Sequence, residues 1–233
     1  MKRGRRGIAL LLCAAMLSCL QACAGSAGAA GVDSAEKPVQ VHWPKDKLKT
    51  GKNGAPLLQV YVVEDQQVKE RELESYVEGV LAGEMKNDWP LEALKAQAIL
   101  ARTFVLKFVQ EKESQYPGAD ISTDIEEAQA YDASAVNERI QQAVEETRGL
   151  VLSCEGELPY AWFHAHSGGM TEYARTGLGW EKDEPAYTQP SRGTEPEQLS
   201  DAKENQQLQA AAEWKLILRL QNGQRLAINR AFR

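Results

Sequence analysis

Cysteine is scarce in the 233-residue chain, and most of it lies at one end. Of the four cysteines, three fall within the first 23 residues and only Cys154 lies in the body of the chain. A disulfide framework of the kind that holds small secreted domains together is therefore excluded. The body has to be stabilised by a hydrophobic core, and a hydrophobic fraction of 43% is ordinary for a globular protein.

The chain also lacks an excess of positive charge. It has 27 basic and 33 acidic residues, which give a net charge of −6 at pH 7. This balance argues against a nucleic-acid-binding protein that is held by a generally basic surface. The apolar stretch at residues 8–20 is shorter than the roughly 20 residues of a transmembrane helix, and the composition excludes a multi-span membrane protein.

The first 23 residues have the pattern of an export signal. A cationic start precedes the apolar stretch 8–20, and the small residue Ala22 stands before Cys23. The tetrapeptide 20–23 resembles a bacterial lipobox, so we expect a lipoprotein signal peptide at residues 1–22 and lipidation of Cys23. The protein would then sit on the outer face of the bacterial cell membrane, outside the cytoplasm. Ordinary secretion and an uncleaved anchor are the alternatives.

Residues 23–56 are expected to form the lipidated cysteine and a flexible tether. Ala, Gly and Ser dominate residues 24–31, and lysines alternate with Pro and Gly farther along. Such a composition buries little apolar surface. The folded domain is therefore expected at residues 57–233.

The body has the hydrophobic periodicity of an α+β protein. It predicts a helical hairpin, packed with antiparallel strands, followed by a third helix and a β-hairpin. The expected elements are a strand at 57–63, helices at about 70–85, 90–110 and 134–148, and strands at 150–153 and 159–166.

Glu84 stands out on the first of these helices. It follows Leu73 by eleven residues, so the two side chains project within about 20° of each other on a helix. Glu84 thus extends an apolar stripe that includes Val77 and Val80. Burial against apolar surface disfavours the charged form of a carboxylate, which suits a general acid. The alternative is that the helix frays at Gly83 and Glu84 turns to solvent.

Two cations border the apolar face of the second helix. Lys95 and Arg102 lie seven residues apart on one side of it. If the two helices form a short-looped hairpin, both cations would lie near Glu84, where they could hold it or contact a polar ligand. Their alternative role is structural, with the aliphatic stems packed and the charges in solvent.

The predicted strand at 159–166 ends in further polar groups. His164 and His166 could share a metal ion, but no third ligand is evident, and pairing of Cys154 with His164 as a thiol nucleophile is a further alternative. The turn at 167–169 exposes backbone amides. We predict no metal site here.

Several segments in order resemble the stage II sporulation protein D family, which includes the amidase-enhancer proteins of bacterial cell walls. They are Tyr76–Met85, Trp89–Ala98 and Ala101–Phe104, then Gln129-Ala130-Tyr131, then Phe163–Glu172 with its Ser-Gly-Gly-Met-Thr. The resemblance covers about residues 57–187.

The resemblance implies a peptidoglycan lytic transglycosylase that cleaves glycan strands already stripped of stem peptides and yields 1,6-anhydro products. It implies Glu84 as the catalytic residue and a bilobed domain around a glycan groove. The groove would be lined by Lys95, Arg102, Gln129, Tyr131, His164, Ser167 and Thr171. The implied partners are peptidoglycan, a cell-wall amidase and membrane-bound engulfment proteins. The alternatives are a non-catalytic peptidoglycan-binding amidase activator and a structural envelope lipoprotein.

The chain departs from the family pattern twice. Some members bind zinc through Cys and His before Gln-x-Tyr, but residues 120–128 contain neither, and Ala128 stands where a cysteine is expected. We therefore predict no zinc and no other cofactor. Members usually continue into a Gly- and His-rich segment that the chain does not reach by Arg233. The expectation is an incomplete C-terminal part that leaves an apolar surface uncovered.

Overall fold

The computed structural model describes residues 39–164, 169–192 and 226–232. The chain divides into two units, Met1–Lys37 and Pro38–Arg233, and all described residues belong to the second. The predicted signal peptide, Cys23 and Ser167 lie outside the described residues and stay predictions. Helices and antiparallel strands give an α+β fold, as predicted.

A small sheet is built around strand β2 (Pro56–Val62), close to the predicted strand. Its alternate residues Leu58, Val60 and Val62 are buried, as expected for a strand with one face on the core. Strand β3 (Gln67–Glu72) pairs with it antiparallel along its length. The short strands β1 (Lys49–Thr50) and β4 (Ile121–Ser122) pair with it antiparallel and parallel, respectively.

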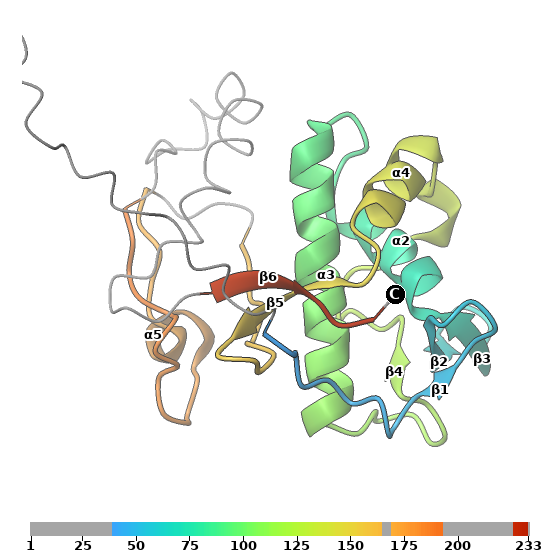
Figure 1. Ribbon diagram of the computed structural model, residues 1–233, viewed down its shortest axis with the longest axis horizontal. Coiled ribbons are helices and arrows are strands. Elements are labelled where there is room, and N and C mark those ends of the chain that lie inside the picture. The colour runs from blue at the N-terminus through green and yellow to red at the C-terminus, as the bar shows by residue number, and fades with distance from the viewer. Residues whose placement is uncertain (1–38, 165–168, 193–225, 233) are drawn as a thin grey trace, which may run out of the picture. The chain divides into compact units, whose positions relative to one another are not determined.

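Three helices pack around the core (Figure 1). Helix α2 (Leu73–Glu84) follows β3 directly, α3 (Leu91–Glu111) is the long central helix, and α4 (Glu138–Glu146) contacts both. The predicted stripe of α2 is buried, but the helix begins three residues later than expected because 70–72 belong to β3. Within the part that the structure describes, no helix has the length and apolar character needed to cross a membrane.

Helix α4 also begins later than predicted. A short 3₁₀ turn at Ala133–Ala135 comes first, and Asn137 then caps α4 by accepting hydrogen bonds from the amides of Arg139 and Ile140 at 3.0 and 3.2 Å. An asparagine at this position satisfies amides that have no partner inside the helix. The segment 133–137 is thereby kept out of the helix and next to α2.

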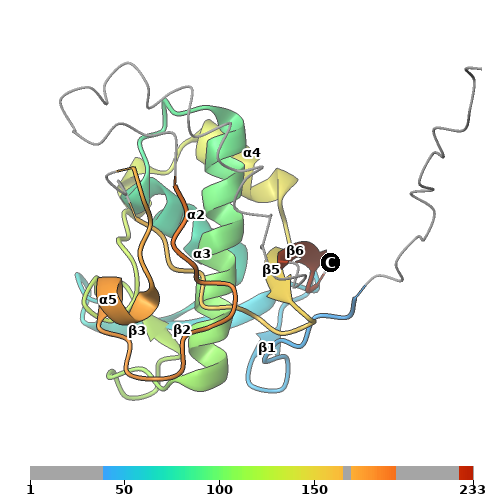
Figure 2. The ribbon, with the colours of Figure 1, turned by 90° about the vertical axis from the view of Figure 1, so that its left-hand side faces the viewer.

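The predicted β-hairpin is wrong in its second strand. Strand β5 (Leu150–Cys154) turns at Glu155 and Gly156, both with positive φ, but residues 159–164 are in no strand. The partner of β5 is β6 (Leu226–Arg230), which runs antiparallel beside it (Figure 2). Pro159 has no amide hydrogen to donate to a ladder, which disfavours the expected pairing.

The expected tether is wrong from residue 39 onward. Val41 and Leu48 are buried, and the ring of Trp43 lies 5.7 Å from that of Phe232. The Nζ atom of Lys47 donates to the carbonyl of Val109 at 2.9 Å, which ties this segment to the end of α3. A few apolar side chains, spaced among lysines, are thus enough to dock the segment on the domain.

Candidate active site

Glu84 is the last residue of α2 and is half-buried, so the helix does not fray before it. Its Oε1 atom accepts a hydrogen bond from the backbone amide of Ala130 at 2.8 Å. Among the described residues, its Oε2 atom has no hydrogen-bond partner. One oxygen of this carboxyl group is therefore fixed by the protein, and the other is available to a ligand.

An open cavity of about 430 Å³ lies at this carboxyl group. It is lined by the end of α2 and the turn that leads to α3 (residues 82–88), and by Ala135 and Ile140. Polar side chains at positions 84 and 86–88 are thus combined with apolar ones. Because the cavity is open to solvent, part of a polar ligand can lie against the Glu84 carboxyl group there.

The motif Gln129-Ala130-Tyr131 lies against α2 beside this cavity. The Tyr131 ring stacks on Tyr76 with 5.3 Å between centroids, and burial raises the pKa of Tyr131. Gln129 is buried, and neither its side-chain nitrogen nor its oxygen has a hydrogen-bond partner among the described residues. An unpaired buried amide is rare in proteins, which marks Gln129 as a residue that a bound ligand or water can satisfy.

The segment before this motif is held by side-chain hydrogen bonds. The hydroxyl of Tyr116 donates to Asp124 at 2.6 Å, and the hydroxyl of Ser114 donates to Glu127 at 2.9 Å. The hydrogen bond to Asp124 is the main reason why the pKa of Tyr116 is raised to about 12, and it lowers the pKa of Asp124. Tyr116 also stacks on Tyr61 of β2 at 3.9 Å between centroids. These contacts fix the loop to the sheet.

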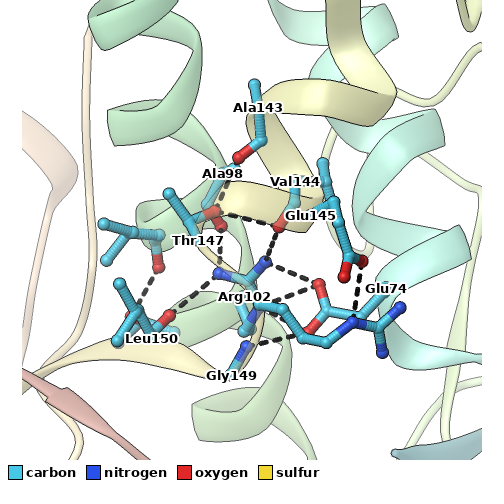
Figure 3. Close-up of polar contacts among 12 residues, drawn as sticks. Glu74, Ala98, Arg102, Ala143, Val144, Glu145, Thr147, Gly149 and Leu150 are labelled. Carbon is cyan, nitrogen blue, oxygen red and sulfur yellow. Dashed lines mark hydrogen bonds and ion pairs between the residues drawn. The ribbon is translucent and has the colours of Figure 1, made fainter. Parts of the chain in front are cut away.

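Arg102 does not face Glu84, and the sequence-based expectation that it does is wrong. It is fully buried and makes a bidentate ion pair with Glu74, at the opposite end of α2, with distances of 2.6 to 3.1 Å (Figure 3). Its remaining donors reach backbone carbonyls, with Leu150 the nearest at 2.9 Å. Glu74 also accepts from the amide of Gly149 at 3.1 Å. The pair joins α2, α3, α4 and β5.

Lys95 is likewise bound to other carboxylates. Its Nζ atom lies 2.5 Å from Glu146 of α4 and 2.7 Å from Glu92. The hydrogen bond to Glu146, followed by that to Glu92, raises the pKa of Lys95. The expectation that this cation holds Glu84 is therefore also wrong, although a fifth of its side chain stays exposed.

The remaining predicted residues lie after β5. His164 is exposed, and the hydroxyl of Thr171 accepts from the amide of Ser191 at 2.7 Å. Within residues 39–164, 169–192 and 226–232, no group of three or more His, Cys, Asp or Glu is placed to hold a metal ion.

An aromatic cluster in the same region was not predicted as a site. The rings of Tyr160, Trp162 and Trp180 lie 4.8 to 5.0 Å apart, and Lys107 lies 4.8 Å from the centre of the Tyr160 ring. Tyr160 and Trp162 lie two residues apart, the spacing of side chains on one face of an extended segment, and this spacing was the available signal. No spacing in the sequence indicated Trp180, because it joins the cluster only through the turn that follows α5 (Ala174–Leu178).

The segment that carries Glu84 is similar to a known protein family. Residues 63–153 match the family model of the stage II sporulation protein (SpoIID). Stage II sporulation protein D of Bacillus subtilis is 29% identical over 183 residues, 68% of this chain and 53% of that protein. The Bacillus subtilis amidase enhancer is 36% identical over 96 residues, 41% of this chain and 12% of that protein.

A third relative, an uncharacterized protein of Brachyspira hyodysenteriae, is 37% identical over 114 residues, 48% of this chain and 30% of that protein. The matched part of each relative is thus about half of its length or less. The matched residues 63–153 begin directly after β2 and end within β5, and they include Glu84 and its hydrogen-bond donor Ala130. They support assignment of this segment to the stage II sporulation protein D and amidase-enhancer family.

Proposed function

We propose that the protein is a peptidoglycan lytic transglycosylase that acts in sporulation or cell-wall remodelling, with Glu84 as its catalytic residue. The observation that supports this most is the state of the Glu84 carboxyl group. One of its oxygens is held by an amide, the other has no partner among the described residues, and the group lies on the wall of an open cavity. The family membership supports the cell-wall role.

The proposed reaction needs a single carboxyl group. Protonated Glu84 gives its proton to the glycosidic oxygen between N-acetylmuramic acid and N-acetylglucosamine, and the bond from that oxygen to the anomeric carbon breaks. The C6 hydroxyl oxygen of the muramic residue bonds to the same carbon, and its proton returns to Glu84. The products are a 1,6-anhydro end and a free hydroxyl on the other sugar. The reaction therefore consumes no water and requires no second carboxylate.

The glycan groove proposed from the sequence has to be revised. Arg102 is fully buried in its ion pair and is removed from it. Gln129 and Tyr131 stay in the proposed groove because their segment borders Glu84, and Lys95, His164, Ser167 and Thr171 stay as proposed contacts. The turn at residues 86–88 is added because it lines the cavity.

The proposed setting is the outer face of the cell membrane, to which lipidated Cys23 would anchor the protein. A cell-wall amidase that strips stem peptides is the proposed partner, together with engulfment proteins. One relative carries the name amidase enhancer.

The test is an incubation of the protein with peptide-free glycan strands, followed by mass spectrometry for 1,6-anhydro ends. The Glu84→Gln variant keeps the shape of the side chain but has no acidic proton, so it should form such ends about 1,000-fold more slowly. The matched control is Glu78→Gln, which changes a half-buried glutamate of the same helix that does not line the cavity. Loss of activity in Glu78→Gln alone, or equal activity in the wild type and Glu84→Gln, would contradict the proposal.

The alternative function is that of a non-catalytic amidase activator, and the name of the amidase-enhancer relative favours it. The same incubation then gives glycan binding without anhydro ends. Addition of the protein to a purified cell-wall amidase should raise the rate of stem-peptide release, and Glu84→Gln should do so equally well.

A further inference from the structure

Two glycines on one face of α2, Gly79 and Gly83, lie one helical turn apart and directly under the segment 130–131. A Cβ atom on Gly83 would be 2.7 Å from both the carbonyl carbon of Ala130 and the amide nitrogen of Tyr131. A Cβ atom on Gly79 would be 2.3 Å from the Tyr131 ring. Glycine inside a helix lowers its stability, so two of them at this spacing indicate a need for close approach of another backbone.

The segment is held on this glycine face by two backbone hydrogen bonds. The amide of Asp132 donates to the carbonyl of Gly79 at 2.9 Å, and the amide of Ala130 donates to Oε1 of Glu84 at 2.8 Å. The first bond lies near the middle of α2 and the second at its end. The distance between the segment and the helix therefore determines whether the Ala130 amide can reach the carboxyl group.

The bond from Ala130 also distinguishes the two oxygens of Glu84. An amide hydrogen that points at Oε1 opposes a second hydrogen on that oxygen, so the acidic proton is directed to Oε2. This oxygen has no partner among the described residues. A general acid needs its proton in a fixed place within hydrogen-bond reach of the leaving oxygen.

We propose that Gly83 is a positioning residue, which lets the Ala130 amide bind Oε1 of Glu84 and so assigns the proton to Oε2. Gly79 has a supporting role, because the atoms that it accommodates belong to a side-chain ring that can move. The effect on catalysis rests on the proposed function of Glu84, whereas the contact between Ala130 and Glu84 does not.

The contact is tested by NMR of the ¹⁵N-labelled protein. The chemical shift of the Ala130 amide proton should follow the ionisation of Glu84 in a pH titration, and this response should be absent in Glu84→Gln. Gly83→Ala should move the Ala130 signal upfield and abolish its response, because the added methyl group displaces the backbone. Gly79→Ala should change it less. Gly177→Ala is the matched control, since a Cβ atom there has its nearest neighbour at 3.6 Å.

The catalytic effect is tested on peptide-free glycan strands at a temperature at which every variant is folded. Gly83→Ala should lower kcat about 100-fold with little change in KM, since misplacement of a reacting group by about 1 Å has an effect of this size. Gly79→Ala should lower kcat less than Gly83→Ala does, and Gly177→Ala should leave kcat unchanged.

The two failures can be distinguished. An Ala130 signal that ignores the ionisation of Glu84, or a Gly83→Ala variant with wild-type kcat, overturns the positioning role. If the wild type itself makes no anhydro ends, the proposed function fails, and the NMR titration still decides whether the contact exists.

Discussion

The two ends of α2 each carry a glutamate, and the two carboxyl groups are in opposite situations. Glu74, in the first turn, is buried and accepts hydrogen bonds from Arg102 and from the amide of Gly149. Glu84, the last residue, is half-buried and accepts one hydrogen bond, from Ala130. The same side chain on the same helix is thus fully paired at one end and half paired at the other.

One of these carboxylates therefore holds the fold together, and the other is available for chemistry. A buried charge with all its hydrogen bonds made holds its surroundings together, and removal of its partner leaves an uncompensated charge. A carboxyl group with a free oxygen on a cavity can exchange a proton with a ligand. Substitutions at the two ends should therefore separate stability from activity.

The largest effect is expected for Glu84→Gln on activity. Loss of a general acid typically lowers a rate by 10²- to 10⁴-fold, so the formation of anhydro ends should fall by about 1,000-fold. The free energy of unfolding, measured by urea titration, should change little, because glutamine can still accept the hydrogen bond from Ala130. A large loss of stability in this variant would break the distinction between the two ends.

The opposite result is expected for Glu74→Gln. Removal of one partner of a buried ion pair usually lowers the free energy of unfolding by about 3–5 kcal/mol, because Arg102 stays buried without a counter-charge. The measurement is again urea titration. The double variant Glu74→Leu with Arg102→Met should be clearly more stable than Glu74→Gln. If the double variant instead lost as much free energy of unfolding as Glu74→Leu and Arg102→Met lose separately, added together, this expectation would be contradicted.

The sequence predicted the position of the glutamate at one end of α2, but it did not predict the ion pair at the other end. The helical period placed Glu84 on the buried stripe, and its half-buried position agrees with that. The same reasoning put Arg102 beside Glu84 because it considered only the cation's own helix. In an antiparallel hairpin that joins residue 84 to residue 91, the residue opposite Arg102 is close to position 74. Counting along both helices would have found its partner.

Other features depend on contacts between distant segments, and no local pattern carries them. Strand β3 (Gln67–Glu72) has mostly charged and polar residues, and it is a strand because β2 pairs with it. The pairing of β5 with β6 joins parts of the chain about 75 residues apart. Gly83 and Ala130 acquire their relation to Glu84 only when the loop lies on the helix.

Thr103, next to Arg102 in the chain, makes a neutral contact between α3 and β5. The hydroxyl of Thr103 accepts from the amide of Leu152 in β5 at 2.9 Å and donates to the carbonyl of Ile99 at 2.7 Å. Thr103→Val keeps the volume and leaves a buried amide unpaired, so it should lower the free energy of unfolding by about 1–3 kcal/mol. A loss as large as that of Glu74→Gln would show that charge has no special role there.

The smallest effect is expected at the loop that carries Ala130. Because the hydrogen bond to Asp124 raises the pKa of Tyr116 from 10 to about 12, the folded protein keeps this proton between those pH values while the unfolded chain loses it. This contribution to stability is complete below pH 10 and is lost as the pH rises towards 12. The stability difference between wild type and Tyr116→Phe should therefore shrink over this range, as followed by urea titration. A constant difference would contradict the contact.

The pairing of β5 with β6 has a consequence for the order of folding. Strand β5 leads out of the junction at Glu74 and Arg102, but its ladder partner lies about 75 residues farther along the chain, at residues 226–230. Contacts between such distant segments slow folding, because a long loop has to close first. Until then β5 presents an open edge that another chain can bind. A delay in the pairing of these two strands is therefore expected to favour aggregation.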